Sequence, residues 1–296
     1  MKPGDVVRLV TLAAICGGSF VFMRVVAPVL GPILTADLRV LIGGAALLIY
    51  FWIIRFPMEW KKNAKHYLIV GVLNTAIPFS LFAFAARHLP ASYSVILNSS
   101  TPLFGAIYAA LWLNDPLTFR KTVGLLVGTS GAALVAGVGG AQADELFVLS
   151  VLACLGAASC YGLSGVYIKK FATHTTPMGF AGGSQLLAGL ALLPLTPFST
   201  IQGSITSSVI LSVLGLSLIC SSLAFLLYFK LIQDIGPART MTVTFLMPVF
   251  GMLWSALFLK ETITWVMLAG CGLIILGTTW VVSQKKPVRS LEPSLR

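Results

Sequence analysis

Two groups of small polar residues lie at matching places in the two halves of the chain, each just before a proline inside an apolar segment. The first group is Asn98-Ser-Ser-Thr before Pro102, and the second includes Thr244 before Pro248. A proline ring removes one backbone N–H and clashes with the carbonyl four residues earlier, so each proline frees a carbonyl beside polar side chains. Amide and hydroxyl groups in this setting could bind a small zwitterion or a neutral polar solute.

Other polar residues within the apolar segments are candidates for the same site, because polar groups at membrane depth are costly and often functional. The sequence predicts substrate contacts from Ser19, Tyr93, Asn98, Ser99, Thr101, Tyr161, Ser164, Gln185, Ser221, Thr244 and Phe245, with helix kinks at Pro102 and Pro248. Asn98 is the first candidate. A structural alternative stays open, because such hydroxyls also bond to their own backbone or to a neighbouring helix, and can heal a kink.

The residue pattern does not favour enzyme chemistry. Five cysteines stand singly, without the spacing of a metal site, so we expect free thiols and no cofactor or metal: Cys16, Cys154, Cys160, Cys220 and Cys271. The Gly162-Leu-Ser164-Gly165 stretch has the GxSG form of intramembrane serine proteases, but that nucleophile needs a histidine base, and no histidine lies inside a predicted span. There is also no Walker-type Gly-Lys-Ser/Thr sequence.

Composition places the chain in a membrane. Hydrophobic residues make up 57% of it and charged residues only 10%, with a mean hydropathy of +0.94, whereas soluble domains carry about 25% charged residues. We expect an all-α integral membrane protein with ten spans. The predicted spans are Val7 to Val26, Ala36 to Ile54, Tyr67 to Ala86, Ser92 to Leu113, Val123 to Val138, Leu146 to Ile168, Met178 to Leu195, Val209 to Ile232, Ala238 to Leu259 and Ile263 to Val282.

The second half of the chain repeats the first at the offset that separates Pro102 from Pro248. Ten identities occur at this offset over the 34 positions from Pro102 to Val135, which indicates a duplicated bundle. Five spans is an odd number, so the two copies must enter the membrane in opposite senses. We therefore predict two inverted five-helix repeats, at 1–140 and 141–284, followed by a basic tail at 285–296.

The distribution of positive charge predicts the orientation. With a cytoplasmic N-terminus, 16 of the 20 Lys and Arg residues fall on the cytoplasmic side, and only Arg24, Arg39, Arg87 and Lys260 fall toward the far side. This asymmetry explains the net charge of +11 without a nucleic-acid partner. We expect a multi-pass protein of the bacterial inner membrane, with the lipid bilayer as a partner and both termini cytoplasmic; the first segment is a span and not a signal peptide.

Paired broken helices in inverted repeats are typical of transporters, and the acidic residues suggest how such a carrier would be driven. Of nine Asp and Glu residues, only Asp37 lies inside a predicted span, at its outer start, although proton-driven carriers usually have a titrating group within the bundle. We therefore favour facilitated diffusion without ion coupling. His88, at the outer end of the third span, is the alternative proton site.

The fifth span carries Gly124, Gly128, Ala132 and Ala136 at four-residue spacing, and the tenth keeps Gly270 and Gly277. Such small-residue faces let another helix approach closely. We assign these two spans to scaffolding between the halves or to a homodimer contact.

The stretch from Phe82 through His88 and Asn98 to Pro102-Leu-Phe resembles the EamA family of the drug/metabolite transporter superfamily, and within it the YddG-type amino acid exporters. Gly17-Gly-Ser-Phe followed by Arg24, and the turn at Asp115 answered by Glu261, support the resemblance. The resemblance implies a ten-helix carrier that exports aromatic and other hydrophobic amino acids by alternating access. Efflux of drugs or hydrophobic cations, or of another metabolite, is the alternative; rings for such a cation would come from Tyr93, Tyr108, Tyr161, Phe245 and Trp254.

Overall fold

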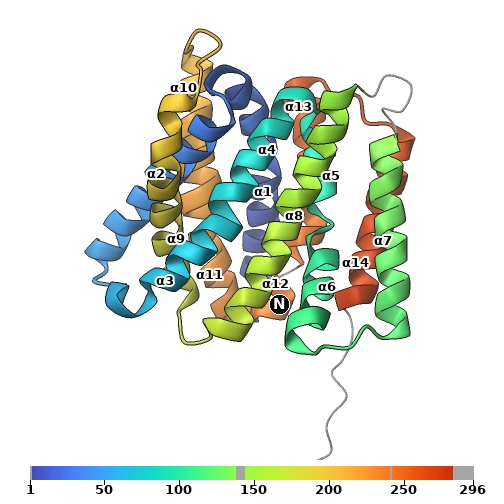
Figure 1. Cartoon of the computed structure of the whole chain (residues 1–296), viewed down its shortest axis with the longest axis horizontal. Coiled ribbons are helices and arrows are strands. Elements are labelled where there is room, and N and C mark those ends of the chain that lie inside the picture. The colour runs from blue at the N-terminus through green and yellow to red at the C-terminus, as the bar shows by residue number, and fades with distance from the viewer. Residues whose placement is uncertain (1, 138–143, 241, 283–296) are drawn as a thin grey trace, which may run out of the picture.

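The computed structural model describes residues 2–137, 144–240 and 242–282, and within these ranges it contains helices and no strand (Figure 1). The predicted tail at 285–296 lies outside the described residues. In chain order the helices are α1 (Pro3–Leu30), α2 (Pro32–Ile53), α3 (Trp60–Gly71), the π-helical η1 (Val72–Ala76), α4 (Ile77–His88), α5 (Ala91–Asn98), α6 (Thr101–Leu113), α7 (Phe119–Gly137), α8 (Glu145–Phe171), α9 (Pro177–Leu192), the 3-10 helix η2 (Leu193–Phe198), α10 (Ser207–Leu214), the π-helical η3 (Gly215–Leu223), α11 (Ala224–Ile235), α12 (Pro237–Thr240), α13 (Val243–Leu259) and α14 (Trp265–Val282).

The described helices fit a membrane. Eight of them, some built from two or three consecutive elements, are long and apolar enough to cross a bilayer. Helix α13 is also apolar but has 17 residues, and α7, which begins close to Arg120 and Lys121, is not among the eight. The all-helical membrane fold is thus as predicted, while the ten spans and their inverted repeat stay predictions.

Several local backbone features recur at the offset that separates Pro102 from Pro248. Both π-helical segments interrupt a long helix at corresponding positions, Val72–Ala76 in the first half and Gly215–Leu223 in the second. The turns after α6 and α13 each place one residue in the left-handed region, Asn114 with φ 51° and Lys260 with φ 54°. In each turn the following residue donates its N–H to a carbonyl six residues earlier, over 3.3 Å from Asp115 and 3.2 Å from Glu261.

The predicted fourth span is divided between α5 and α6 at the polar group before Pro102. Pro102 lies in the first turn of α6 and has no N–H to return to the Asn98 carbonyl. That carbonyl instead accepts a hydrogen bond from the Thr101 hydroxyl over 2.8 Å. Pro248, in contrast, lies inside the continuous helix α13, which begins five residues before it at Val243. The two prolines therefore have different local structures.

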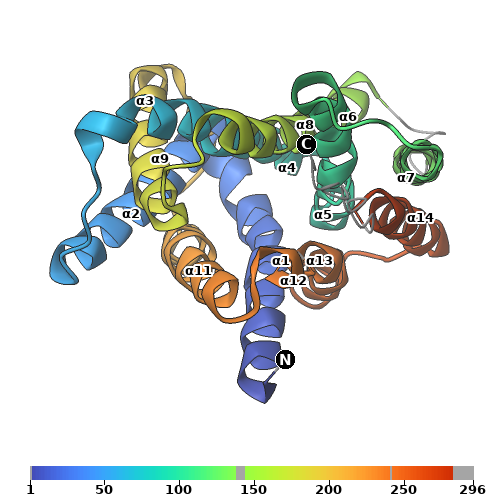
Figure 2. The ribbon, with the colours of Figure 1, turned by 90° about the horizontal axis from the view of Figure 1, so that it is seen from below.

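Helices α7 and α14 lie side by side at one edge of the molecule (Figures 1 and 2). Glycines form their contact: a Cβ on Gly124 would lie 2.7 Å from the Gly277 carbonyl, and a Cβ on Gly131 would lie 2.6 Å from the Gly270 carbonyl. The small-residue faces of the fifth and tenth predicted spans thus pack against each other within one chain. They form an internal scaffold, and neither glycine face is open to a second copy.

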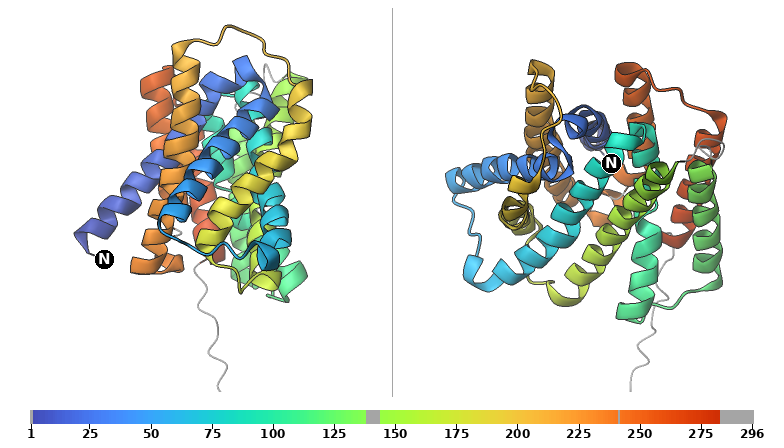
Figure 3. Two further views of the ribbon diagram at one scale, coloured as in Figure 1. Left: turned by 90° about the vertical axis from the view of Figure 1, so that its left-hand side faces the viewer. Right: turned by 45° about the horizontal axis from the view of Figure 1, so that its top comes forward.

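The remaining helices surround the centre of the molecule, as the view from below shows (Figure 2). The largest buried apolar cluster joins α1, α4, α5 and α8, with Met267, Cys271 and Ile274 from α14. The first turns of α1 project from the rest of the bundle (Figure 3). Helix α1 is thus the element that reaches from the central packing to the end of the molecule where the chain begins.

Candidate functional site

A cavity of about 590 Å³ lies between the central helices. Its wall is mainly apolar and aromatic, with few polar side chains, which is the usual composition of a small-molecule site. Helices α1, α2, α3, η1, α4, α5, α6, α8, α9, η3, α11, α12 and α13 contribute to it. The lining residues on which the argument depends are Leu12, Cys16, Ser19, Phe20, Arg39, Phe79, Phe82, Asn98, Ser99, Thr101, Pro102, Tyr161, Thr175, Ile232, Thr240 and Thr244.

The cavity extends from the middle of the bundle toward the end where α1 begins. Leu12, on the third turn of α1, Ile232 near the end of α11, Thr240 at the end of α12 and Thr175 between α8 and α9 all line it. These segments gather at the lower end of the molecule in Figure 1. At the opposite end, where α1 finishes and α14 begins, none of the described residues lines the cavity.

At the opposite end, polar contacts join the two halves of the chain. The Glu261 carboxylate, in the turn before α14, accepts hydrogen bonds from the backbone N–H groups of Ala91 and Ser92 over 2.7 and 3.1 Å, and from the Ser92 hydroxyl over 2.7 Å. It thereby caps α5, whose first N–H groups have no partner within that helix. Gln202 adds a second tie, because its side chain accepts a hydrogen bond from Arg87 over 2.7 Å.

The corresponding carboxylate of the first half has a different partner. Asp115 forms an ion pair of 2.7 Å with Lys121, within the same turn and the helix that follows it. The backbone of the two turns is alike, but Asp115 contacts the helix that directly follows its own turn, whereas Glu261 contacts α5, which is far away in the sequence.

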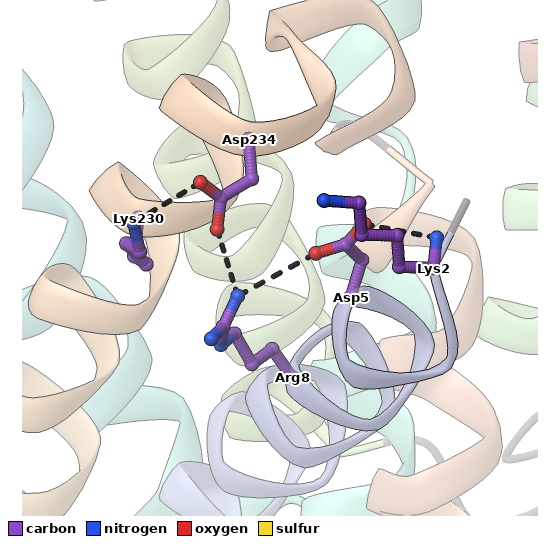
Figure 4. Close-up of polar contacts among 5 residues, drawn as sticks. All are labelled: Lys2, Asp5, Arg8, Lys230 and Asp234. Carbon is purple, nitrogen blue, oxygen red and sulfur yellow. Dashed lines mark hydrogen bonds and ion pairs between the residues drawn. The ribbon is translucent and has the colours of Figure 1, made fainter.

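An ionic cluster joins α1 to α11 beside the open end of the cavity (Figure 4). Arg8 contacts Asp234 over 2.7 Å and Asp5 over 3.5 Å, and Lys230 contacts Asp234 over 3.1 Å. The Asp5 carboxylate also accepts a hydrogen bond from the backbone N–H of Lys2. Both acids are therefore already balanced by cations, and neither lines the cavity.

The structure brings about half of the predicted site residues to the cavity. Those that line it are Ser19, Asn98, Ser99, Thr101, Tyr161 and Thr244, together with Pro102. Of these, Asn98 differs from its neighbours, because its Oδ1 atom is buried and has no hydrogen-bond partner within the described residues. The hydroxyls of Ser19, Ser99 and Thr101 donate to backbone carbonyls of their own segments, as the structural alternative expects.

The other predicted residues do not line the cavity. They are Tyr93, Ser164, Gln185, Ser221, Phe245, Pro248 and the predicted proton site His88. Tyr93 packs edge-on against Phe147, and Gln185 is fully buried where α9 meets α2 at Gly43. These helices are apolar around most of their circumference, so the sequence does not tell which face turns inward.

Ser164 has none of the surroundings of a nucleophile. Its hydroxyl is buried without a hydrogen-bond partner in the described part of the chain. The glycine before it in the GxSG pattern serves packing instead: a Cβ on Gly162 would lie 2.6 Å from the backbone nitrogen of Gly105, where α8 meets α6. Among the described residues, no histidine forms the hydrogen bond with Ser164 that a serine nucleophile needs.

Arg39 lines the cavity although the sequence analysis did not name it as a site residue and used its charge as evidence of orientation. Its side chain lines the cavity and is 6% exposed. Nε donates a hydrogen bond to the Ser221 hydroxyl over 3.0 Å, and the guanidinium lies 3.7 Å from the centre of the Phe79 ring. The signal that could have found it is a lone arginine inside an apolar span, which marks a functional position by default.

Known proteins are similar to this chain in sequence and in fold. The model of the EamA-like transporter family matches residues 6–137 and again 148–283. The uncharacterized transporter YvbV of Bacillus subtilis is 29% identical over 260 residues, which is 86% of this chain and 84% of that protein. Protein PecM of Dickeya dadantii is 26% identical over 272 residues, 89% of each chain. A solved crystal structure superposes with a TM-score of 0.66 at 17% identity and covers 95% of this chain and 98% of its own, which shows a shared fold.

Proposed function

The chain belongs to the EamA-like transporter family, and from this premise we propose that it exports aromatic and other hydrophobic amino acids by alternating access. One observation carries the proposal: a cavity of about 590 Å³ reaches the middle of the bundle from one end while Glu261 ties the other end shut. A carrier must expose one central site to the two sides in turn, and a cavity closed at one end is one state of that cycle.

The wall of the cavity suits a solute with an apolar body and a polar head. Phe20, Phe82 and Tyr161 offer rings, whereas Asn98 and Arg39 offer polar groups. The volume falls within the range of about 300–1,000 Å³ that is usual for small-molecule sites. Hydrophobic cations, the alternative substrates, find no carboxylate among the residues that line the described cavity, and no observation favours them.

The proposed orientation places the open end of the cavity in the cytoplasm of a bacterial cell. The concentration of Lys and Arg on the side of the N-terminus supports it, because cytoplasmic loops retain these residues. The inverted repeat, with units at 1–140 and 141–284, belongs to the same proposal. The recurrence of the π-helical segments and of the turns at Asn114 and Lys260 supports it.

We further propose that the solute moves down its own gradient without an ion. No Asp, Glu or His lines the described cavity. Asp37 is buried in α2, and His88 lies at the end of α4 with its ring 5.4 Å from Phe84, but neither reaches the cavity wall. A zwitterion carries no net charge, so a membrane potential would not drive it, whereas one net charge gains about 2.3 kcal/mol per 100 mV.

The test is uptake of labelled tryptophan into proteoliposomes that contain the purified protein. We expect counterflow of tryptophan with no ion gradient, at a rate that an imposed pH difference or potential does not change. Vesicles without protein are the control. Uphill accumulation driven by a pH difference and lost in Asp37→Asn or His88→Ala would contradict the uncoupled mechanism, and transport of a lipophilic cation but not of tryptophan would contradict the substrate class.

Asn98→Ala should reduce tryptophan counterflow by about tenfold or more. Its Oδ1 atom is a buried acceptor in the cavity wall without a partner in the described structure, and one hydrogen bond to a charged ligand group contributes about 1.5–3 kcal/mol. Ser130→Ala on the exposed face of α7 is the matched control, because the Ser130 hydroxyl donates only to Leu126 O of its own helix. Equal rates for the two variants at matched protein levels would remove Asn98 from the site.

A further inference from the structure

Arg39 is a buried cation that lines the cavity, and its two Nη atoms have no hydrogen-bond partner among the described residues. A guanidinium has five N–H donors. Only the Nε donor of Arg39 is engaged within the described residues, in the bond to Ser221, and no hydrogen bond of its Nη atoms is formed there. We propose that Arg39 is the carboxylate receptor of the cavity, and that a carboxylate is the group every transported solute must carry. The proposal rests on the proposed function in one respect only, namely that the cavity binds the solute.

No acid of the described structure balances the Arg39 charge. The four ion pairs found there involve Arg8, Lys121 and Lys230 and do not include Arg39. Asp37 is two residues earlier on α2, and residues two apart on a helix do not face each other. A buried charge without a counter-ion costs several kcal/mol, so such residues in membrane proteins usually pair with another group or with a substrate.

The surroundings of Arg39 hold its guanidinium in place before any ligand arrives. The Arg39 Cζ atom lies over the Phe79 ring of α4, 3.7 Å from its centre, and Ser221 from η3 accepts the Nε hydrogen bond. Phe79 is 7% exposed and Ser221 is fully buried, so neither partner is free to swing away. A receptor fixed in advance loses little conformational freedom on binding.

The chemistry of this arrangement selects one kind of head group. The two Nη atoms of a guanidinium match the two oxygens of a carboxylate, and the pair forms two parallel charge-assisted hydrogen bonds. The rings of Phe20, Phe82 and Tyr161 line the same cavity and suit an apolar or aromatic body. An organic cation in this cavity would meet a positive charge of its own sign, which excludes amines that lack an acid group.

The experiment compares four indole compounds that differ only in their head groups. Tryptophan carries two charged groups, a carboxylate and an ammonium, whereas indole-3-propionate carries only the carboxylate. Tryptamine carries only the ammonium, and tryptophanamide carries the ammonium beside an uncharged amide. We expect both carboxylates to compete with labelled tryptophan for the purified full-length protein, and both amines to bind at least tenfold more weakly. Arg39→Gln should weaken the binding of the two carboxylates by at least tenfold and leave the binding of the amines unchanged or stronger. Arg39→Lys keeps the charge but loses the two Nη atoms of the guanidinium, so its affinity for the carboxylates should lie between those of the wild type and Arg39→Gln.

Arg120→Gln, an exposed arginine of α7, is the charge-matched control and should bind all four compounds as the wild type does. Equal affinity of the wild type for tryptophan and tryptamine would overturn the proposal. A loss in Arg39→Gln that is the same for carboxylates and amines would also overturn it. If indole-3-propionate binds in an Arg39-dependent manner but tryptophan is not transported, the amino acid assignment fails and the carboxylate receptor stands.

A measurement without ligand decides the case in which none of the four compounds binds. An unpaired buried cation destabilises the protein when no ligand is bound. Replacing a buried charge by an apolar side chain of similar size is often stabilising, so Arg39→Met should raise the melting temperature of the ligand-free protein. A structural arginine would give the opposite result, since its loss would leave Ser221 and Phe79 without their partner. A lower melting temperature for Arg39→Met would therefore contradict the proposal.

Discussion

Gly277→Leu should abolish or severely reduce the yield of folded protein. A Cβ on Gly277 would overlap the backbone of Gly124 and Gly128 on α7, and backbone atoms cannot move aside as a flexible side chain can. Overpacking of a close helix contact costs about 1–3 kcal/mol or more, and a clash with backbone lies at the upper end of this range or beyond it. The measurement is the melting temperature of the purified protein in detergent, and we expect a drop of roughly 10 °C or no monodisperse peak at all.

Gly272→Leu provides a control on the same helix. A Cβ at Gly272 has no atom within 4 Å, so a leucine there extends away from the α7 contact. We expect its melting temperature to stay within a few degrees of that of the wild type. If both leucine variants lost the same stability, the damage would come from changing α14 itself, and the glycine contact would not be the scaffold.

Glu261→Ala should open the end of the molecule that is shut in this structure. The substitution leaves the N–H groups of Ala91 and Ser92 without their acceptor, at a cost of about 1–3 kcal/mol, which corresponds to a shift of roughly 5- to 150-fold in the population of the closed state. Cys16 lines the cavity and reports on its access. In a variant that keeps only this cysteine, a membrane-impermeant maleimide should label Cys16 from the periplasmic side much faster once Glu261 is replaced.

The control for this experiment is Glu145→Ala, which removes an exposed acid at the start of α8 and should leave the labelling unchanged. Glu261→Gln keeps one acceptor oxygen and should fall between the wild type and the alanine variant. Unchanged periplasmic labelling in Glu261→Ala would mean that the apolar packing of α1 with α13, and not the carboxylate, closes this end.

The sequence predicts the membrane class and the interruption at Pro102 because both depend on local rules. Apolar length sets the helices, and a proline removes a hydrogen bond wherever it occurs. Asn98 lies in the cavity wall beside the interruption, and its contact with a substrate stays a prediction. Pro248 shows the limit of the local rule, since the same residue type in the second half lies within continuous α13.

The rest of the site depends on how each helix is rotated, and an apolar sequence carries little information about that. A helix in a membrane is apolar toward lipid and toward protein alike, so no amphipathic period separates Gln185 or Ser164, which are buried away from the cavity, from Tyr161, which lines it. Arg39 was missed for a different reason: near a span end, an arginine fits the charge asymmetry of the loops equally well, and only its buried contacts with Phe79 and Ser221 separate the two roles.

The turn carboxylates Asp115 and Glu261 make different contacts, so closure of one end of the molecule would be more stable than closure of the other. Glu261 accepts three hydrogen bonds from the start of α5, whereas Asp115 pairs with Lys121 only six residues away. In the proposed orientation, the unloaded carrier would then rest with its site facing the cytoplasm, ready for loading, and the return of the empty carrier would not limit turnover during the proposed export. Half-saturating concentrations on the two faces would differ, and the maximal rates would differ by the same factor, because a carrier without coupling cannot favour one direction at equilibrium.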